Sequence, residues 1–330
     1  MRNIHSLTLL VLSLCISNLN GQQVFFVKEN GQGNGSSWRD AAGNLQAVLN
    51  KSNFGDQIWV AKGTYFPEGP HRESCFEIKD GVQLLGGFGG SEDNAAKRNP
   101  AVFKTILSGE IGKPGNLDNC YNVILTRHVS EKTVVDGFTI TGGNADGVGP
   151  NASRQRCGGG WYNDGSKGVS NPTVVNCIFI ENQARDGAGM YNNGRTGEAS
   201  PRLSNCIFIK NNADLDGGGL YNDGRNKGKS NPELTACILE GNHANYGGGM
   251  FNYGGGGMSS PTLKNCQIIK NLAYVRGGAL LNMDFGGISL ANIEACSITD
   301  NEASVGEGIY QFSSVNGSGI KSLTDQSKLK

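Results

Sequence analysis

The fold is decided by one repeated phrase, Pro201-Arg-Leu-Ser-Asn-Cys-Ile-Phe-Ile-Lys-Asn-Asn-Ala213, followed by Gly217-Gly-Gly-Leu-Tyr-Asn222. Its cysteine recurs at intervals of 29, 31, 29 and 30 residues, at Cys177, Cys206, Cys237, Cys266 and Cys296. Repetition at an almost fixed period is typical of one structural unit stacked on copies of itself. The sequence therefore predicts a solenoid.

Two columns of the aligned copies are uniformly apolar. Three residues before the cysteine stand Val174, Leu203, Leu234, Leu263 and Ile293, and two residues after it stand Phe179, Phe208, Leu239, Ile268 and Ile298. The position directly after the cysteine is mixed, with Ile178 but also Gln267 and Ser297. Alternation with period two is typical of a β-strand. We expect the cysteine and its apolar neighbours to face inward.

The second half of each copy is rich in asparagine and glycine. One position is asparagine throughout, at Asn182, Asn211, Asn242, Asn271 and Asn301. A glycine-rich triplet follows at 158–160, 187–189, 217–219, 247–249 and 277–279, with Gly306-Glu-Gly308 as a weaker copy. A third inward apolar column comes next, at Trp161, Met190, Leu220, Met250, Leu280 and Ile309.

An earlier copy precedes the clear ones. The segment Thr133-Val-Val-Asp-Gly-Phe-Thr-Ile140 aligns with Thr173-Val-Val-Asn-Cys-Ile-Phe-Ile180, and residues 146–157 form an additional loop. Six related units result. The phrase also resembles a leucine-rich repeat, but a helix in each unit would not tolerate so much glycine. A right-handed parallel β-helix, with one coil of short strands per unit, fits better.

The overall composition supports an all-β chain. The sequence has 51 glycines and 9 prolines, and its 29 basic residues balance 29 acidic ones. No basic stripe is present, so we expect no nucleic-acid partner.

The chain divides into four parts. Residues 1–21 are typical of a signal peptide, with cleavage after Gly21 favoured over lipidation of Cys15. Residues 22–131 are predicted to form irregular first coils with strands at 24–28, 57–61, 82–88, 105–108 and 122–126. An amphipathic helix at 37–51 is predicted to cap the open end. Residues 132–312 carry the regular repeats, and 313–330 form a polar tail. The mature chain contains no other segment that is predicted to cross a membrane.

The chain resembles two groups of known proteins. The repeat phrase Gly217–Asn222 is similar to repeats of the polymorphic outer-membrane protein type. Four other segments are similar to exported bacterial proteins of the pectin-lyase-like β-helix class. They are Gly35-Ser-Ser-Trp-Arg-Asp40, Gln57-Ile-Trp-Val-Ala-Lys-Gly-Thr-Tyr65, Gly86-Gly-Phe-Gly-Gly90 and Val135-Asp-Gly-Phe-Thr-Ile-Thr-Gly-Gly143. This resemblance implies export and a β-helix. It implies no single activity, because these groups include adhesins, surface proteins and polysaccharide-degrading enzymes.

The cysteine and asparagine columns are interpreted as structural ladders. Five aligned thiols at the interstrand spacing favour buried apolar filler over disulfides or a metal. A bridge among Cys75, Cys120 and Cys157 is left open. Stacked asparagine amides favour hydrogen bonds from coil to coil, for the column at Asn182 and for a second one at Asn163, Asn192, Asn222, Asn252 and Asn282. We expect no cofactor. Calcium ligation is the alternative for the asparagines and for Asp186 and Asp216, which precede the glycine triplet.

An aromatic column is the best candidate for a binding site. It consists of Tyr162, Tyr191, Tyr221, Phe251 and Tyr310, interrupted by Leu281. Because it alternates with inward columns, we expect it to point outward. Outward rings would stack on sugar rings or on a partner surface. The alternative is that the rings stack only on each other and stiffen the sheet.

These observations favour a non-catalytic role: surface adhesion, or binding of an extracellular glycan or cell-surface protein, by a chain that is secreted or held on the outer cell surface. The alternative is a polysaccharide lyase or glycoside hydrolase. Such an enzyme needs clustered carboxylates, often beside a basic residue. Asp136, Asp146, Asp164 and Arg156 are the candidates to converge near the 146–157 insertion.

Overall fold

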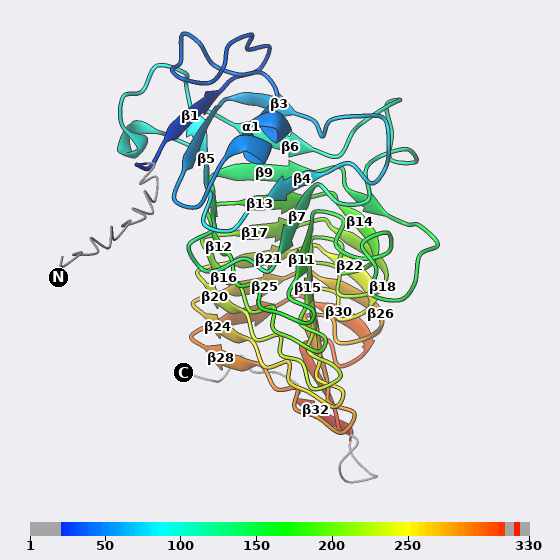
Figure 1. Ribbon diagram of the computed structural model, residues 1–330. Helices are drawn as coiled ribbons and strands as arrows, with labels where there is room; N and C mark the ends of the chain where they lie inside the picture. The colour runs from blue at the N-terminus through cyan, green and yellow to red at the C-terminus, as the bar shows by residue number, and fades with distance from the viewer. Residues whose placement is uncertain (1–20, 314–319, 324–330) are drawn as a thin grey trace, which may run out of the picture.

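The computed structural model describes residues 21–313 and 320–323. Within these ranges the chain winds into a parallel β-helix whose coils are stacked from the N-terminal to the C-terminal end (Figure 1). The predicted signal peptide lies almost wholly outside the described residues, as does most of the predicted tail. No helix in the described ranges is long and apolar enough to span a membrane.

Four sheets run along the solenoid. The first has nine strands: β1 (Val24–Val27), β2 (Gln57–Ala61), β5 (Gln83–Phe88), β8 (Val134–Asp136), β12 (Thr173–Val175), β16 (Arg202–Ser204), β20 (Glu233–Thr235), β24 (Thr262–Lys264) and β28 (Asn292–Glu294). The second has eight: β3 (Gly63–Tyr65), β6 (Thr105–Ser108), β9 (Phe138–Thr141), β13 (Ile178–Ile180), β17 (Ile207–Ile209), β21 (Ile238–Glu240), β25 (Gln267–Ile269) and β29 (Ser297–Thr299).

The third sheet has six strands: β10 (Asn144–Ala145), β14 (Gln183–Asp186), β18 (Asn212–Asp216), β22 (His243–Tyr246), β26 (Leu272–Arg276) and β30 (Glu302–Val305). The fourth has nine: β4 (Phe76–Ile78), β7 (Ile124–Arg127), β11 (Trp161–Asp164), β15 (Met190–Asn193), β19 (Leu220–Asp223), β23 (Met250–Tyr253), β27 (Leu280–Met283), β31 (Ile309–Phe312) and β32 (Ile320–Leu323). Strand β32 pairs antiparallel with β31 and was not predicted.

The inward columns are confirmed. Val174 pairs with Leu203, Phe179 with Phe208, and Met190 with Leu220, so equivalent residues of successive coils lie side by side. The three columns and the cysteines belong to one buried cluster that runs through the solenoid. In the last coil the apolar members Ile293 and Ile298 are only partly buried. The parallel β-helix therefore follows from the period-two pattern.

The proposed alignment of the earlier copy is wrong by one residue. Val174 pairs with Val135, and Phe179 pairs with Ile140. Because side chains alternate between faces, a shift of one residue would have turned Val135 and Ile140 away from the core. Both are fully buried, so burial fixes the observed register.

Residues with left-handed backbone make the corners of each coil. The residue before each ladder cysteine has φ between 49° and 54°, at Asn176, Asn205, Ala236, Asn265 and Ala295. The first residue of the glycine triplet has φ between 62° and 72°, at Gly158, Gly187, Gly217, Gly247, Gly277 and Gly306. A Cβ on Gly217 would stand 2.3 Å from the Leu220 carbonyl oxygen. This corner, which we call the glycine bend, therefore requires glycine.

Two buried asparagine ladders connect the coils. Asn211 Oδ1 accepts from the backbone N–H of Asn182 at 3.1 Å and from its Nδ2 at 3.0 Å, and each following coil repeats this pattern through Asn301. In the second ladder each Nδ2 donates to the next Oδ1 at 2.8–3.0 Å, from Asn163 through Asn282. The amides satisfy one another and the corner backbone, as buried polar groups must.

The helix in the N-terminal region is shorter than predicted. Helix α1 spans Leu45–Lys51 and begins where the Asn44 side chain accepts from the Ala47 N–H. Trp38, expected in the helix, instead packs edge-on against Phe26, so 37–44 is not helical. Leu45, Val48 and Leu49 bury the inner face of α1 in the main core. That α1 caps the open end stays a prediction. A 3-10 helix, η1, spans Ala95–Lys97.

The strands predicted for 22–131 are found as β1, β2, β5, β6 and β7 within one or two residues. The short strands β3 and β4 were not predicted. They pair with β6 and β7, so this segment forms coils that continue the sheets of the regular repeats.

Replacing Gly217 by alanine should destabilise the protein by at least about 3 kcal/mol, because the new Cβ meets a carbonyl oxygen in a left-handed corner. Gly241→Ala is the matched control: its φ is 58°, but nothing lies within 4 Å of the added Cβ, so we expect a cost of about 1 kcal/mol. Urea unfolding of both variants measures the difference, and equal losses would contradict the steric origin of the glycine bend.

Replacing Asn242 by alanine should cost about 2–4 kcal/mol, because the Asn211 backbone N–H and Nδ2 lose a buried acceptor. The exposed neighbour Asn212 is the control, and Asn212→Ala should change the unfolding free energy by less than about 0.5 kcal/mol. Similar unfolding curves for the two variants would show that the ladder contributes little.

Candidate functional site

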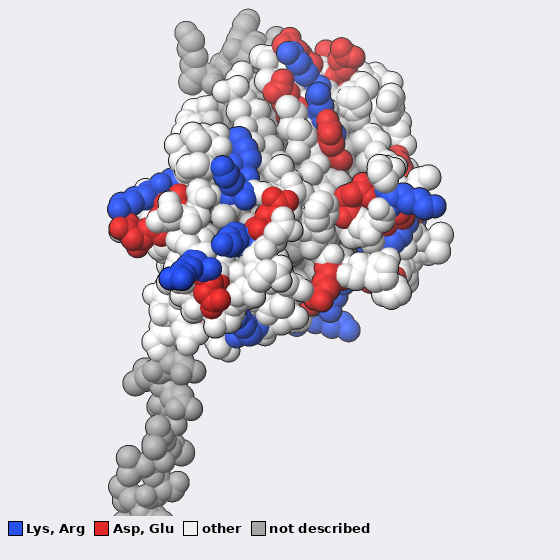
Figure 2. Space-filling model, turned by 90° about the horizontal axis from the view of Figure 1, so that it is seen from above, with Lys and Arg blue, Asp and Glu red and all other residues white. Residues whose placement is uncertain are grey.

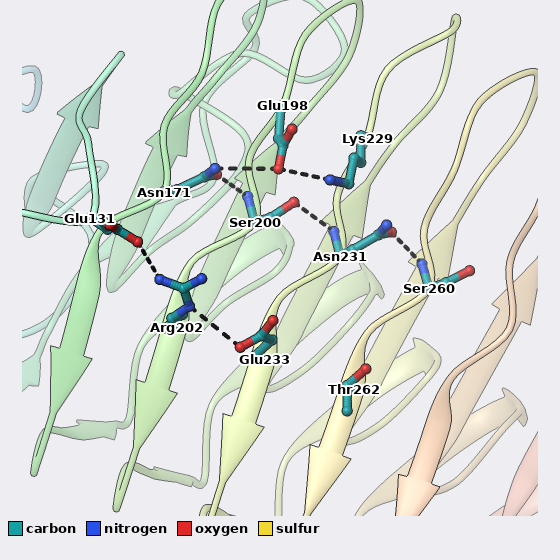
Figure 3. Close-up of a pocket in the computed structure, with 10 residues that line it drawn as sticks. All are labelled: Glu131, Asn171, Glu198, Ser200, Arg202, Lys229, Asn231, Glu233, Ser260 and Thr262. Carbon is teal, nitrogen blue, oxygen red and sulfur yellow. Dashed lines mark hydrogen bonds and ion pairs between the residues drawn. The ribbon is translucent and has the colours of Figure 1, made fainter.

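A polar cleft of about 350 Å³ crosses the coils where the loops lead into the first sheet (Figure 3). Its walls come from successive coils, just before or within the start of β8, β12, β16, β20 and β24. The lining residues are Glu131, Asn171, Glu198, Ser200, Arg202, Lys229, Asn231, Glu233, Ser260 and Thr262. We call this hollow the polar cleft.

One wall of the polar cleft is a ladder of alternating asparagine and serine. Asn171 Oδ1 accepts from the Ser200 N–H at 2.6 Å, Ser200 Oγ from the Asn231 N–H at 3.0 Å, and Asn231 Oδ1 from the Ser260 N–H at 2.7 Å. Each of the four residues directly precedes a proline. These bonds hold the side chains in place, so the wall is pre-organised.

The charged groups of the polar cleft are paired with one another. Arg202 forms ion pairs with Glu131 and, at 3.4 Å, with Glu233. Lys229 pairs with Glu198 at 3.1 Å. The side chains of Arg202, Glu131 and Glu233 are more than half exposed, so the pairs can rearrange around a ligand.

Sequence reasoning missed the polar cleft. Its residues lie in or beside the polar linkers between copies, to which the sequence analysis assigned no role. The available signal was the polar residue that recurs before Pro172, Pro201, Pro232 and Pro261.

The prediction that the aromatic column is exposed is wrong. Tyr162, Tyr191, Tyr221, Phe251 and Tyr310 are 0–4% exposed and, with Leu281, form a second buried cluster. Alternation does direct the rings away from the main core. Other segments meet their hydroxyl ends. Tyr162 Oη donates to the Ala152 carbonyl at 2.6 Å, and Tyr191 Oη donates to Asp223 at 2.5 Å. The first rings stack on each other at centroid distances of 5.5, 4.9 and 4.8 Å, and none is available to a sugar.

Three carboxylates surround this buried aromatic cluster. Asp223 is fully buried and accepts from Arg225 Nε at 2.8 Å and Nη2 at 2.6 Å. Asp186 and Asp216 lie in register on β14 and β18, directly before the glycine bend. Asp186 is 5% exposed, and its Oδ1 has no hydrogen-bond partner.

Burial raises the pKa of Asp186 to about 6, although nearby Arg185 and Arg156 oppose the shift. Burial also raises the pKa of Asp216 to about 7, and the Asp186 charge adds to the effect. A carboxyl that retains a proton near neutral pH has the property of a general acid. Sequence analysis considered these two aspartates only as calcium ligands.

The predicted catalytic group does not converge. Asp136 pairs with Arg98, Asp146 with Arg72 at 2.6 Å, and Asp164 accepts from Ser166. Arg156 donates to Asn151 and to the Gly149 carbonyl at 3.2 Å. Each group has its own partner because the four residues lie on different segments around the insertion.

The ladder thiols donate to main-chain carbonyls. Cys177 Sγ lies 3.3 Å from the Val175 oxygen, and the other four repeat this contact with the residue two positions before. Burial raises the pKa of Cys177 to about 12, which keeps the thiol protonated. Cys75, Cys120 and Cys157 are also free thiols. The described residues contain no group of three or more His, Cys, Asp or Glu side chains arranged to hold a metal ion.

Comparisons with known proteins leave the family open. Neither a protein family nor a curated protein matches the chain in sequence. Among solved structures it is similar to pectate lyase Pel9A, with 12% identity over 87% of this chain and 79% of that one and a TM-score of 0.49. A pectin methylesterase from Aspergillus niger is 14% identical, with a TM-score of 0.35 over 89% of this chain and 90% of that one. A 1,3-α-1,4-β-D-galactose-4-sulfate-3,6-anhydro-D-galactose-2-sulfate 4 galactohydrolase is 10% identical, with a TM-score of 0.35 over 79% and 60%.

Stability should fall as pH rises from about 4 to 7. Because the folded pKa values of Asp186 and Asp216 lie above the unfolded value of about 3.9, the folded state binds more protons in this window. Asp216→Asn should flatten the dependence of the melting temperature on pH, measured from pH 5 to 8. The control variant Glu302→Gln removes an exposed carboxylate and should leave the dependence of the melting temperature on pH unchanged. If the melting temperature of Asp216→Asn depends on pH as steeply as that of the unaltered chain, Asp216 is not the source of this dependence.

Proposed function

We propose that this chain is an exported, surface-located or secreted β-helix protein that binds a neutral, extended glycan in the polar cleft without cleaving it. The proposal is carried by the wall of Asn171, Ser200, Asn231 and Ser260, which presents similar groups on four successive coils. Polar groups repeated at the coil spacing suit a polymer with a repeating unit. Each serine that accepts a backbone N–H still has a hydroxyl proton to donate.

The charges of the polar cleft favour a neutral ligand. Glu131, Glu198 and Glu233 supply three negative charges, whereas Arg202 and Lys229 supply two positive ones that are already paired. An acidic glycan would meet excess carboxylate and compete for engaged cations. On the face shown in Figure 2, basic and acidic side chains are likewise interspersed. Hydroxyl groups of a neutral glycan would pair with both signs of charge.

The same pairing supports binding over catalysis in the polar cleft. Each glutamate is held by a cation, so none of the three is set apart to take or give a proton. This arrangement is suited to a ligand that stays intact.

A second function is favoured by the aspartates of the glycine bend. Asp186 and Asp216 are stacked carboxyls beside Arg185 and Arg225, an arrangement compatible with acid–base cleavage of a polysaccharide. Release of reducing or unsaturated sugars by the purified protein, and its loss in Asp216→Asn, would support this function over binding alone.

The glycan-binding proposal is tested by calorimetry with cellohexaose, laminarihexaose, mannohexaose and hexagalacturonate, with and without calcium. We expect a neutral hexasaccharide to bind and to be recovered intact. Glu233→Ala should weaken its binding about tenfold, because a charged hydrogen-bond partner is lost.

The matched control is Glu294→Ala, which breaks the exposed Lys264–Glu294 ion pair of 3.1 Å on the same sheet but outside the polar cleft. It should bind like the unaltered chain. Equal affinities of the two variants would exclude the polar cleft as the binding site, and a preference for hexagalacturonate would exclude a neutral ligand.

A further inference from the structure

A row of aromatic side chains lies at or just after the ends of the last strands of the fourth sheet. Tyr253 and Phe285 are in edge contact at a centroid distance of 6.0 Å, and Phe285 lies 4.9 Å from Phe312. Phe285 is 47% exposed, and the other two rings are partly exposed. These three rings, which we call the aromatic row, cross the last coils of the solenoid.

Two residues of the aromatic row, Tyr253 and Phe312, take the place of polar side chains of the earlier coils. Tyr253 and Phe312 stand in one column with Asn193 and Asp223. The earlier members are buried, and they bind the hydroxyls of Tyr162 and Tyr191. From Tyr253 onward the column is apolar and partly exposed, so the surface changes from polar to aromatic along this flank.

A loop of four glycines leaves room for the Tyr253 ring. A Cβ on Gly255 would stand 2.8 Å from Tyr253 Cε2. On one neighbouring coil, the Arg225 guanidinium lies 4.5 Å from the centre of the same ring. On the other, Phe285 packs against its edge. The Tyr253 ring therefore lies against bare backbone in a slot between a cation and an exposed aromatic side chain.

Phe285 occupies a backbone conformation that aromatic residues rarely adopt. Its φ is 29°, in the left-handed region that disfavours bulky side chains. An exposed phenylalanine gains little from burial to offset this cost. Strain of this kind is typical of positions retained for function.

A polar pocket of about 240 Å³ lies on the coils that precede the aromatic row. It is lined by Asn151, Ala152, Ser166, Asn193, Arg195, Thr196 and Asn226. The Asn226 N–H donates to the Gly255 carbonyl at 3.0 Å, which connects the pocket to the slot of Tyr253. Aromatic faces pack against the C–H face of a sugar ring, and amides and guanidinium groups bind its hydroxyls.

We propose that Tyr253, Phe285 and Phe312 form a second carbohydrate site that stacks a neutral sugar ring, next in line along the solenoid to the polar pocket of the preceding coils. The loop that begins after Tyr253 ends at Ser260, in the polar cleft. Because both sites would bind a neutral glycan, this inference rests on the proposed function.

The test measures binding of the same neutral hexasaccharides by saturation-transfer NMR and calorimetry, on the full chain. Phe285→Gly and Tyr253→Ala should each weaken binding about 2- to 12-fold and remove saturation transfer from aromatic protons. Glycine accepts the backbone conformation at 285, so thermal unfolding of Phe285→Gly should show no loss of stability. The control is Tyr274→Ala, which removes an exposed tyrosine of β26 that lies outside the row, and this variant should bind normally.

Each outcome is decisive. Weaker binding by both row variants, with Tyr274→Ala unchanged, supports the second site. Unchanged binding by the row variants, while Glu233→Ala still weakens it, overturns the second site and leaves the polar cleft in place. Failure of every neutral hexasaccharide to bind the unaltered chain overturns the proposed function and the second site together.

Discussion

Equivalent side chains of successive coils lie one above another, and this in-register stacking is the constraint on which the structure depends. A buried amide at one level has the same amide above and below it, so Asn182, Asn211 and Asn242 satisfy one another without water. The corners repeat in the same way: at each glycine bend the backbone is left-handed and turns closely onto the strand that follows in the same coil, so the first residue of each triplet is glycine. Repetition in the sequence is thus the direct result of stacking in space.

The inward columns could be predicted because period-two alternation reports directly on which face is buried. Val174, Phe179 and Cys177 are buried as expected. The same rule failed for Tyr191, since its exposure is set by another segment. Asp223, on the next coil, accepts a hydrogen bond from its hydroxyl, and no pattern within one strand reveals that contact. The start of α1 likewise depends on Asn44 and on the packing of Trp38, which the helical spacing alone does not contain.

The candidate sites were hidden for a related reason. The polar cleft is built from linker residues such as Asn171 and Ser200, which align at a fixed distance before the ladder cysteines, but whose convergence into a cleft depends on how the coils stack. The raised pKa values of Asp186 and Asp216 arise from burial at the glycine bend, which the composition of one repeat does not disclose. In both cases the stacked core positions the residues, and the loops and corners supply the chemistry.

Residue-resolved hydrogen exchange tests the stacking most directly, because the backbone N–H groups of Asn182, Asn211, Asn242 and Asn271 donate to side chains one coil away. If the ladders exist, these four amides should exchange among the slowest in the chain, by opening of whole coils. Exchange as fast as that of the exposed residues Leu117 and Val148 would contradict in-register stacking and the parallel β-helix built on it.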